Sequence, residues 1–515
     1  MTTEENRTRS PLARRDLLRA GGAVAGVAGL QLLAPVAFAG AAGAKSPDAP
    51  RAPETRTVTG TFPPGVDDFW YLPVDVPRGV RQIDVSYTYD KPTVPAGVRG
   101  NACDLGVFGP GSLAAGNEKA FRGWSGGFRT SFSINATEAT PGYLAGPVTA
   151  GRWHVVLGPY TVAPQGMHWS VTITLTYGAD GPAFRPDPAP THAPAKERGT
   201  AWYRGDCHLH TVHSDGRRTP DQLVADARAA GLDFITSTEH NTPSAQLVWG
   251  GYATDDLLIL NGEEVTTRSG HWPAIGLPAG TWVDWRYRSS EPAAFRRFVD
   301  EVHAKGGLVT AAHPFAACFG CAFEYDYEPV DLVEVWNGPW DAGDDATVLA
   351  WHSMLRTGTR IPAIGDSDAH NPDQVVGLPQ TVVLASALER GALLRGLAAG
   401  RSWLAESSAV DLTLTASTLG RSVTMGGTLK PGAGADVVVE LAVSGVPGTT
   451  TTIIDQTGPV ASGAVDSSGR GTLTWTTRSR YSTFVRAEVR RAPTVGAAGA
   501  MVAMTNPIYV EVAGS

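Results

Sequence analysis

The chain has 515 residues, of which 42% are hydrophobic and 18% charged. A single ordinary core does not extend over such a length, so about two to four globular domains are predicted. The 60 glycines and 37 prolines indicate many turns and much β structure. The formal net charge of -8 gives no support to a nucleic-acid-binding or anionic-membrane-binding surface.

The N-terminal segment has the features of an export signal. Arg14-Arg15 are followed by DLLR, a short Ala/Gly-rich apolar run and the sequence AFA at residues 37–39, which fits a cleavage site. The run is too short and too weakly apolar to favour a spanning helix. The arginine pair resembles a twin-arginine signal, which predicts the Tat export machinery as a partner and a secreted product without stable membrane insertion. A plain Sec signal or a retained anchor is the alternative.

Composition and periodicity divide the rest of the chain. After a signal and spacer at residues 1–50, period-two alternation in RQIDVSYTYD and HWSVTITLTY predicts an antiparallel β-sandwich or jelly roll at 55–178, with an accessory or packing role. A proline-rich linker at 179–199 is expected to be a stiff spacer or a strap. Strands return in ADVVVELAV and STFVRAEVRR, which predict an immunoglobulin-like β domain at 408–515.

Residues 200–405 show a different hydrophobic periodicity, in which helical segments alternate with short apolar strands. The segment TPDQLVADARAAGLD predicts a helix with Thr219 as N-cap, Pro220 in the first turn and Gly231 beyond its end. A second helix is predicted in EPAAFRRFVDEVHAKGG. Short apolar strands that alternate with helices indicate a parallel β/α arrangement, and the number of units suggests a barrel.

Nine of the twelve histidines lie between residues 208 and 370. In His208-Leu209-His210 the spacing of two places both imidazoles on one side of a strand. Most of the other candidates follow apolar runs, as active-site residues of β/α barrels do at the carboxyl ends of strands. These candidates are Asp215, His240, Glu263, Glu264, His271, His313, Asp366, Asp368 and His370.

This mixture of imidazole and carboxylate suits zinc, manganese or iron. A carboxylate can bridge two cations that together activate a water molecule. Sulfur is not required, and the chain has only four cysteines. Cys318 and Cys321 are expected to form a local disulfide or to remain thiols rather than to hold a metal, and the side chain of Cys207 should face away from that of His208.

The motifs HLHTVHSDG, TEH, GEEV, GH, HP and SDAH, in this order, resemble the PHP (polymerase and histidinol phosphatase) superfamily of metallohydrolases. EVWNGPW, and GDSDAH followed by VGLPQTVV, are similar to the carbaryl-hydrolase-like (CehA/McbA) branch. The resemblance covers roughly residues 200–405. It implies a distorted (β/α)7 PHP barrel with two or three divalent metal ions, here flanked by an N-terminal β-sandwich and a C-terminal Ig-like domain.

The resemblance also implies a distribution of ligands. The first metal would be held by His208, His210, Glu264 and Asp368; Glu264 would bridge to a second metal held by His271 and His313; and Asp215, His240 and His370 would hold a third. The chain departs from the family at two positions. Many members have histidine at position 215, and many have aspartate where this chain has Glu239.

Several nearby residues are not expected to bind metal. Glu263 and Asp366 are the alternatives to Glu264 and Asp368, and the unused residue of each pair should point away from the centre or orient a ligand. Asn337 and Trp340 either line the substrate pocket or belong to an ordinary strand end. Structural, surface or solvated roles are expected for His213, His303 and His352. Three arginines are possible phosphate contacts, although exposed arginines are usually just solvated: Arg217, Arg218 and Arg268.

The residues and the resemblance together predict a metal-dependent hydrolase of a small-molecule phosphate ester. Glu264, Asp368 and His370 are expected to take part in catalysis, as a bridging carboxylate and as groups at the metal rim that assist the leaving group. Hydrolysis of a carboxylic or carbamate ester is the alternative, and a non-catalytic secreted binding protein is a third reading. A phosphate substrate predicts cationic residues beside the metals, whereas an aryl carbamate predicts an apolar pocket.

Overall fold

The structure is a computed structural model that describes residues 35–38, 51–493 and 499–513. The predicted export signal and spacer lie outside the described residues except for residues 35–38, in which Val36–Ala37 forms strand β1. In the described part of the chain, no helix is both long and apolar enough to cross a membrane.

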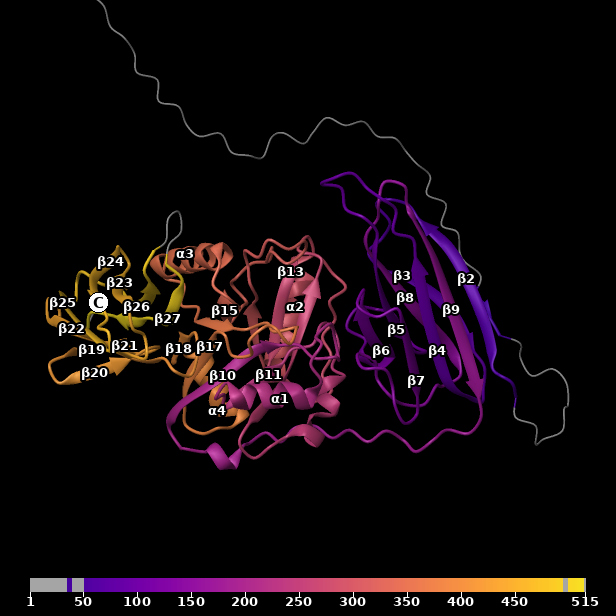
Figure 1. The fold of residues 1–515 in the computed structure, drawn as a ribbon, viewed down its shortest axis with the longest axis horizontal. Coiled ribbons are helices and arrows are strands. Elements are labelled where there is room, and N and C mark those ends of the chain that lie inside the picture. Colours follow the sequence, from indigo (N-terminus) through magenta and orange to yellow (C-terminus); the bar gives the residue numbers. More distant parts are fainter. Residues whose placement is uncertain (1–34, 39–50, 494–498, 514–515) are drawn as a thin grey trace, which may run out of the picture. The chain divides into compact units, whose positions relative to one another are not determined.

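Residues 51–178, called here the N-terminal β region, form two sheets around one apolar core (Figure 1). The sheet orders are β1-β3-β8-β5-β6 and β2-β9-β4-β7. Alternate residues of β4 and β9 are buried, as the period-two pattern predicts, whereas the sandwich or jelly-roll type stays a prediction. The strands are β2 (Glu54–Phe62), β3 (Trp70–Val76), β4 (Val80–Tyr89), β5 (Ala102–Phe108), β6 (Phe121–Gly126), β7 (Ser131–Asn135), β8 (Gly151–Thr161) and β9 (Met167–Tyr177).

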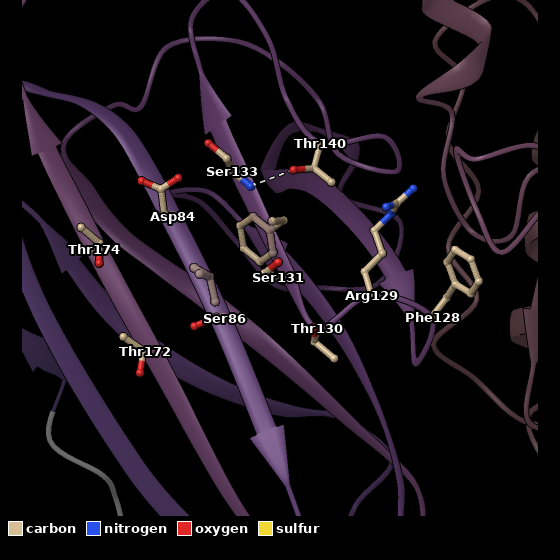
Figure 2. A pocket seen from close by; sticks show the side chains of 12 residues that line it. Asp84, Ser86, Phe128, Arg129, Thr130, Ser131, Ser133, Thr140, Thr172 and Thr174 are labelled. Atoms are coloured by element: carbon tan, nitrogen blue, oxygen red, sulfur yellow. Dashed lines mark hydrogen bonds between the residues drawn. The ribbon is translucent and has the colours of Figure 1, made fainter. Parts of the chain in front are cut away.

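The outer face of the β2-β9-β4-β7 sheet carries short polar side chains. Figure 2 shows Ser86, Thr172 and Thr174 on this face with Asp84 as its acidic residue, and the backbone N–H of Ser133 donates to Thr140 Oγ1 at 3.0 Å. Such a face suits a solvated sheet surface. These residues line a shallow pocket on the sheet face. Phe128, which also lines this pocket, lines the pocket beside the candidate metal centre described below as well.

The central region contains a strongly curled mixed sheet. β10 (Ala201–Leu209), β11 (Phe234–Ser237) and β12 (Leu258–Thr267) are parallel. β13 (Gly270–Ile275) is antiparallel to both β12 and β14 (Leu308–Ala311). β15 (Leu332–Asn337) and β16 (Ala363–Asp366) then continue parallel to β14.

The curl brings the two ends of this series together. Just beyond β16, the N–H of Asp368 donates to the carbonyl oxygen of His208 at 3.0 Å, and Ala369 forms a parallel bridge with Leu209 of β10. The prediction of a purely parallel arrangement is wrong at β13. Only Arg268 and Ser269 connect β12 to β13, and so short a connection produces a hairpin, because parallel neighbours need a long crossover.

Four α-helices accompany the sheet within residues 199–405, all of which the structure describes: α1 (Pro220–Ala229), α2 (Pro292–Ala304), α3 (Ala342–Arg356) and α4 (Arg390–Ala398). The two predicted helices are confirmed as α1 and α2. At the start of α1, the N–H of Thr219 donates to Gln222 Oε1 at 3.0 Å, and Pro220 occupies the first turn. With only four helices, strand and helix do not alternate regularly as in an ideal β/α barrel.

The C-terminal strands are continuous with the central sheet. β17 (Gln380–Ala385) pairs with β10 and with β18 (Ser402–Ala405), and the series continues through β27, β26, β23 and β24. A second sheet has the order β20-β19-β22-β25, and the immunoglobulin-like type stays a prediction. The strands are β19 (Asp411–Thr418), β20 (Arg421–Thr424), β21 (Thr428–Leu429), β22 (Asp436–Ser444), β23 (Thr449–Asp455), β24 (Gly458–Ala464), β25 (Gly471–Arg478), β26 (Phe484–Arg491), β27 (Met501–Thr505) and β28 (Ile508–Val510).

The proline-rich segment 179–199 forms backbone hydrogen bonds to several other parts of the chain. The N–H of Phe184 donates to the carbonyl of Ala136 in the N-terminal β region, and the N–H of Asp187 donates to the carbonyl of Leu247 in the central region. Near its end, the N–H of Ala193 donates to Leu388 O. The segment therefore contacts the regions on both sides of it, and its role as a stiff spacer or a strap stays a prediction.

Aromatic packing joins the N-terminal β region to the central region. The ring of Phe121 stacks on that of Trp282 with centroids 4.3 Å apart, and Trp124 lies 4.6 Å from Trp285. All four side chains are buried in one apolar cluster. Large aromatic side chains contribute much of the burial energy at such contacts.

A buried ion pair reinforces this contact. Arg286 Nη2 lies 2.6 Å from Asp284 Oδ2, and that carboxylate also accepts the N–H of Gly116 from the N-terminal β region. Arg286 further donates to the hydroxyl of Tyr71 at 2.8 Å. Because both charges are buried, each depends on its partner for compensation.

Replacing Arg286 by leucine should therefore leave Asp284 buried and unpaired. We expect Arg286→Leu to lower the free energy of unfolding by about 3–5 kcal/mol, as measured by urea denaturation. Arg288→Leu is the matched control, because its pair with Asp68 is solvent-exposed and should contribute only about 0–1 kcal/mol. Equal losses in the two variants would contradict this assignment.

Candidate metal centre

All nine predicted ligand residues come together at one edge of the curled sheet. They form three groups, and in each group the candidate ligand atoms lie within 4.8 Å of one another. The groups are His208, His210 and Asp368; Glu264, His271 and His313; and His210, Asp215, His240 and His370. His210 belongs to two groups, so these two adjoin.

The strands explain why these residues meet. His208 lies at the end of β10, His240 follows β11, and His313 follows β14, all at the carboxyl edge of the parallel strands. His271 instead lies at the start of β13. Because β13 is antiparallel to β12, its first residues lie at that same edge, where His271 pairs with Thr266.

Glu264 faces residues of all three groups. Its Oε2 lies 3.3 Å from Nε2 of His208, 3.3 Å from Nε2 of His210 and 2.8 Å from Nδ1 of His240. Its Oε1 lies 3.0 Å from Nδ1 of His271 and 3.4 Å from Nε2 of His313. A carboxylate whose two oxygens are directed at different groups has the geometry of a bridging ligand.

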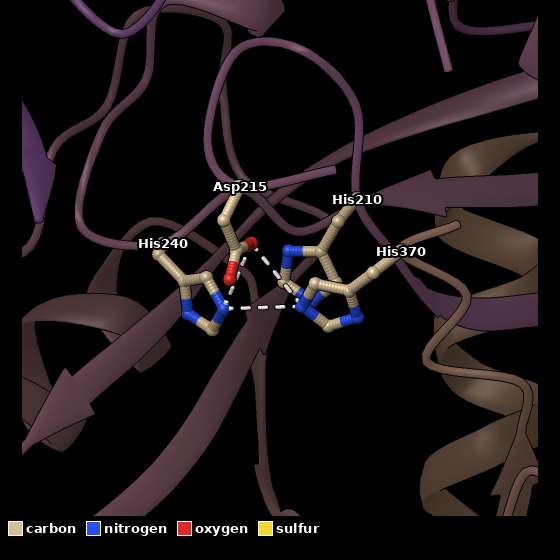
Figure 3. Close-up of side chains that lie close together, drawn as sticks. All are labelled: His210, Asp215, His240 and His370. Atoms are coloured by element: carbon tan, nitrogen blue, oxygen red, sulfur yellow. Dashed lines mark hydrogen bonds and ion pairs between the residues drawn. The ribbon is translucent and has the colours of Figure 1, made fainter. Parts of the chain in front are cut away.

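Asp368 and Asp215 complete the other groups. Asp368 Oδ1 lies 3.4 Å from Nε2 of His208 and 3.1 Å from Nε2 of His210. Asp215 Oδ1 lies 3.4 Å from Nε2 of His240 and 3.2 Å from Nε2 of His370. Figure 3 shows these two imidazoles directed at the Asp215 carboxylate, with the His210 ring beside them.

The donor atoms fit divalent cations. Five of them are buried but make no hydrogen bond to any residue that the structure describes: Nε2 of His208, Nε2 of His210, Oδ1 of Asp215, Oε2 of Glu264 and Oδ1 of Asp368. An unsatisfied buried polar atom costs about 1–3 kcal/mol. Five such atoms that converge, all of them imidazole nitrogens or carboxylate oxygens, therefore match the ligand set of zinc, manganese or iron.

The imidazoles and carboxylates of the centre stabilise one another's charged forms. Burial alone would lower the pKa of His208, but the carboxylates of Asp368 and Glu264 raise it well above the ordinary range. Burial alone would likewise raise the pKa of Glu264, yet His240 and His208 hold it well below its ordinary range. The carboxylates thus stay ionised, as metal ligands must.

Glu334 orients two of the ligands and was not identified from the sequence. Its Oε1 accepts from Nδ1 of His208 at 3.0 Å, and its Oε2 accepts from the N–H of His313 at 2.8 Å. This leaves Nε2 of His208 free to face the centre. The signal in the sequence was its place as the first residue of EVWNGPW, the motif that also contains Asn337.

Asn337 supports the same side of the centre. Its Nδ2 donates to Glu334 Oε2 at 3.1 Å and to Asp368 Oδ2 at 3.3 Å. It therefore holds the oxygen of Asp368 that does not face His208 and His210. Trp340 instead packs edge-on against Trp336, with centroids 5.3 Å apart, and is not among the residues that line the pocket beside the centre.

Glu239, which stands where many family members have aspartate, organises the loop after β10. It accepts from the N–H and hydroxyl of Thr211 and, at 2.6 Å, from the hydroxyl of Ser214. Ser214 Oγ lies 3.3 Å from Nδ1 of His210. Glu239 thus acts on the ligand His210 through Ser214.

The unused carboxylates point away from the donor groups. Glu263 accepts the N–H of Val283 at 3.1 Å, and burial raises its pKa well above the ordinary range. Asp366 accepts the N–H of Cys207 at 2.6 Å, and burial likewise raises its pKa. Cys207 and His213 belong to none of the three groups, and His213 Nδ1 instead lies 2.9 Å from Ser244 Oγ.

Two ligands have left-handed backbone conformations. His313 has φ of 26° and Asp368 has φ of 46°, values that are uncommon for residues other than glycine. The N–H of each is held by the centre itself, through Glu334 Oε2 and His208 O respectively. Such conformations persist where surrounding contacts over-determine them, as at functional sites.

A pocket of about 320 Å³ opens beside the donor groups. Its lining includes Ser214, Asp215, His240 and His271 from the centre, together with Arg268. The remaining residues are Phe69, Ala102, Asp104, Trp124, Ser125, Gly126, Gly127, Phe128, Tyr160, Asn241, Thr266, Trp285, Phe319 and Cys321. Cys321 is disulfide-bonded to Cys318, as one of the two sequence expectations had it.

Of the three arginines considered as phosphate contacts, Arg268 alone lines this pocket. Its side chain is 9% exposed, and neither Nη1 nor Nη2 makes a hydrogen bond within the described chain. Arg218 is instead paired with Asp226 and donates to the carbonyls of Asn371 and Gln374. Arg217 is exposed.

No protein-family model and no curated protein matches the chain. Among solved structures, a two-domain protein of Bacteroides vulgatus containing a predicted PHP-like metal-dependent phosphoesterase is 18% identical, covers 64% of this chain and all of its own, and has a TM-score of 0.35. An amidohydrolase of Chromobacterium violaceum is 16% identical over 34% of this chain and 89% of its own, with a TM-score of 0.25. A Bifidobacterium adolescentis protein assigned as a metal-dependent phosphoesterase is 17% identical over 33% and 92%, with a TM-score of 0.24. These likenesses are distant, so the assignment of the centre depends on its donor atoms.

Glu334 should affect metal affinity without being a ligand. We expect Glu334→Gln to weaken metal binding about 10- to 100-fold, because it removes the carboxylate that orients His208 and His313. Metal titration of the purified variant measures this. Glu263→Gln is the matched control, a buried glutamate on the other face of β12, and should bind metal as the wild type does. Unchanged affinity in Glu334→Gln would refute the orienting role.

Proposed function

We propose that the protein is a metal-dependent hydrolase of small-molecule esters, with a phosphate ester as substrate. The observation that carries this proposal is the set of five buried donor atoms that make no hydrogen bond within the described chain and converge on three adjoining groups. His210, which two groups share, and Glu264, whose oxygens face different groups, would keep neighbouring cations close enough to act on one substrate. A non-catalytic binding role would not require such a set.

When bound, the cations would activate a water molecule as nucleophile and polarise the oxygens of the ester. The protein residues have distinct tasks in this reaction. Glu264 and Asp368 would hold the cations, and His240, His271 and Asp215 would place them at the wall of the pocket. His370 lies at the rim, where Nδ1 donates to the carbonyl oxygen of Asp368 at 2.8 Å and Nε2 faces Asp215. A protonated histidine or aspartate at this rim assists the leaving group.

Arg268 favours a phosphate ester over a neutral ester. Its guanidinium lies in the same pocket as Asp215, His240 and His271 and has no hydrogen-bonding partner among the described residues. Guanidinium binds phosphoryl oxygens through charge-assisted hydrogen bonds. A neutral carbamate has no anionic oxygens that could accept such charge-assisted hydrogen bonds from Arg268.

The second candidate is hydrolysis of a carboxylic or carbamate ester, the activity implied by the resemblance to the CehA/McbA branch. The observation in its favour is the aromatic part of the lining, which includes Phe69, Phe128 and Phe319. The same metal centre would serve both reactions. The leaving group and the charge of the substrate would then distinguish them.

Parallel assays of p-nitrophenyl phosphate and a naphthyl carbamate with protein loaded with Zn, Mn or Fe decide between the candidates. We expect hydrolysis of the phosphate and its loss on chelation. His208→Ala and Glu264→Ala should lose metal and activity together while circular dichroism shows intact β structure. Activity on the carbamate alone would refute the phosphoesterase proposal, and full activity in either variant would refute the centre.

We also propose export through the twin-arginine pathway, which carries folded proteins and so allows metal to be inserted in the cytoplasm. The support is the sequence around Arg14 and Arg15. Replacing both arginines by lysine should retain the protein in the cytoplasm, as measured by fractionation of expressing cells. Export of the double variant at the wild-type level would show that another pathway is used.

A further inference from the structure

The pocket beside the metal centre has two walls that come from different parts of the chain. The central region contributes the metal-binding side, including Asp215, His240 and His271. About half of the lining comes from the N-terminal β region, for which the sequence had suggested only an accessory or packing role. The residues of this second wall whose side chains bear on the argument are Phe69, Asp104, Trp124, Phe128 and Tyr160.

Arg268 is held by this second wall. Its guanidinium lies over the ring of Tyr160, 3.9 Å from the centroid, and its Nη2 is 3.5 Å from Asp104 Oδ2. The stacking and the ion pair fix the position of the guanidinium, but neither satisfies its N–H donors. A buried guanidinium with free donors is costly unless an anion reaches it.

Large aromatic side chains stand exposed around the same pocket. Phe128 is 44% exposed and Phe319 is 47% exposed. Phe319 is held by the hydroxyl of Tyr160, which donates to its carbonyl oxygen at 3.0 Å, and by Arg99, whose guanidinium lies 3.7 Å from its ring centroid. Phe319 is therefore fixed in place, and the two exposed rings are available to stack on a planar group of a ligand.

The second wall is attached rigidly to the metal-binding wall. The N–H of Gly142 donates to Ser244 Oγ at 3.1 Å, and Thr242 Oγ1 donates to the carbonyl of Gly142 at 2.8 Å. Together with the stacking of Phe121 on Trp282, these bonds leave the pocket pre-formed. A volume of about 320 Å³ accommodates a small organic ester.

We propose that the N-terminal β region selects the substrate, and that the substrate carries a planar aromatic group next to its anionic phosphoryl group. Arg268 binds the phosphoryl oxygens, and the aromatic group stacks between the rings of the N-terminal wall and Phe319. This inference rests on the proposed function and adds the class of phosphate ester. The guanidinium, whose Nη1 and Nη2 make no hydrogen bond within the described chain, and the exposed rings share one pocket, so an aryl phosphate satisfies both.

The test compares kcat/KM for phenyl phosphate and methyl phosphate in the metal-loaded protein. Phe128→Ala should lower the ratio of kcat/KM for phenyl phosphate to kcat/KM for methyl phosphate about tenfold, because stacking stabilises only the complex with the aryl ester. Phe315→Ala is the matched control: Phe315 is also 47% exposed but does not line the pocket. Its ratio should equal that of the wild type.

A second variant tests the anion contact. Arg268→Gln should lower kcat/KM for both phosphates about 10- to 100-fold and weaken competitive inhibition by inorganic phosphate to a similar degree. Its metal content should equal that of the wild type, which a collapse of the centre would not allow. Arg217→Gln, at an exposed arginine outside the pocket, is the control and should behave as the wild type does.

The outcomes separate this inference from the function on which it rests. A wild-type protein that hydrolyses neither phosphate with any metal overturns the proposed function and the inference together. A wild-type protein that hydrolyses them, with an unchanged aryl-to-methyl ratio in Phe128→Ala, overturns the stacking. Unchanged inhibition by phosphate in Arg268→Gln overturns the anion contact while the hydrolase stands.

Discussion

The buried carboxylate of Glu264 is the constraint on which the rest of the centre depends. Both of its oxygens are surrounded by imidazoles, three at Oε2 and two at Oε1, all within 2.8–3.4 Å. A carboxylate without water around it requires positive charge at close range. Histidines from one strand cannot surround it, so β10, β13 and the segment after β14 must all reach the same point. The strong curl of the sheet makes this meeting geometrically feasible.

The hairpin of β12 and β13 connects this centre to the substrate pocket. Glu264 lies on β12, His271 lies on β13, and Arg268 lies in the two-residue turn between them. A parallel β13 would place His271 at the opposite edge of the sheet, whereas Arg268, which directly follows β12, would stay at this edge. The local break in parallel order therefore brings a candidate metal ligand to the edge where the cationic side chain and the pocket lie.

The candidate ligands were selected from the sequence on two grounds. The spacing of two in His208-Leu209-His210 follows from strand periodicity, whereas the choice of Glu264 over Glu263 rests on the resemblance to the PHP superfamily. Glu334 was missed because its role depends on reaching His208 and the backbone of His313 across the sheet, which no local pattern reveals. The direction of β13 was missed because apolar runs of this length do not indicate whether a strand is parallel or antiparallel.

The contribution of the N-terminal β region could not be predicted for a related reason. Its side chains at the pocket, such as Tyr160 and Asp104, are far from the metal ligands in sequence and form no recognisable motif. Their effect arises from an interface in which Phe121 and Trp124 pack against Trp282 and Trp285. Burial of this aromatic contact fixes the wall without any flexible element, so the energy that joins the two regions also pre-organises the pocket. On the proposed function, metal binding and substrate choice would therefore be separable: the first would depend on strand ends of the curled sheet, and the second on the wall that the β region brings to the pocket.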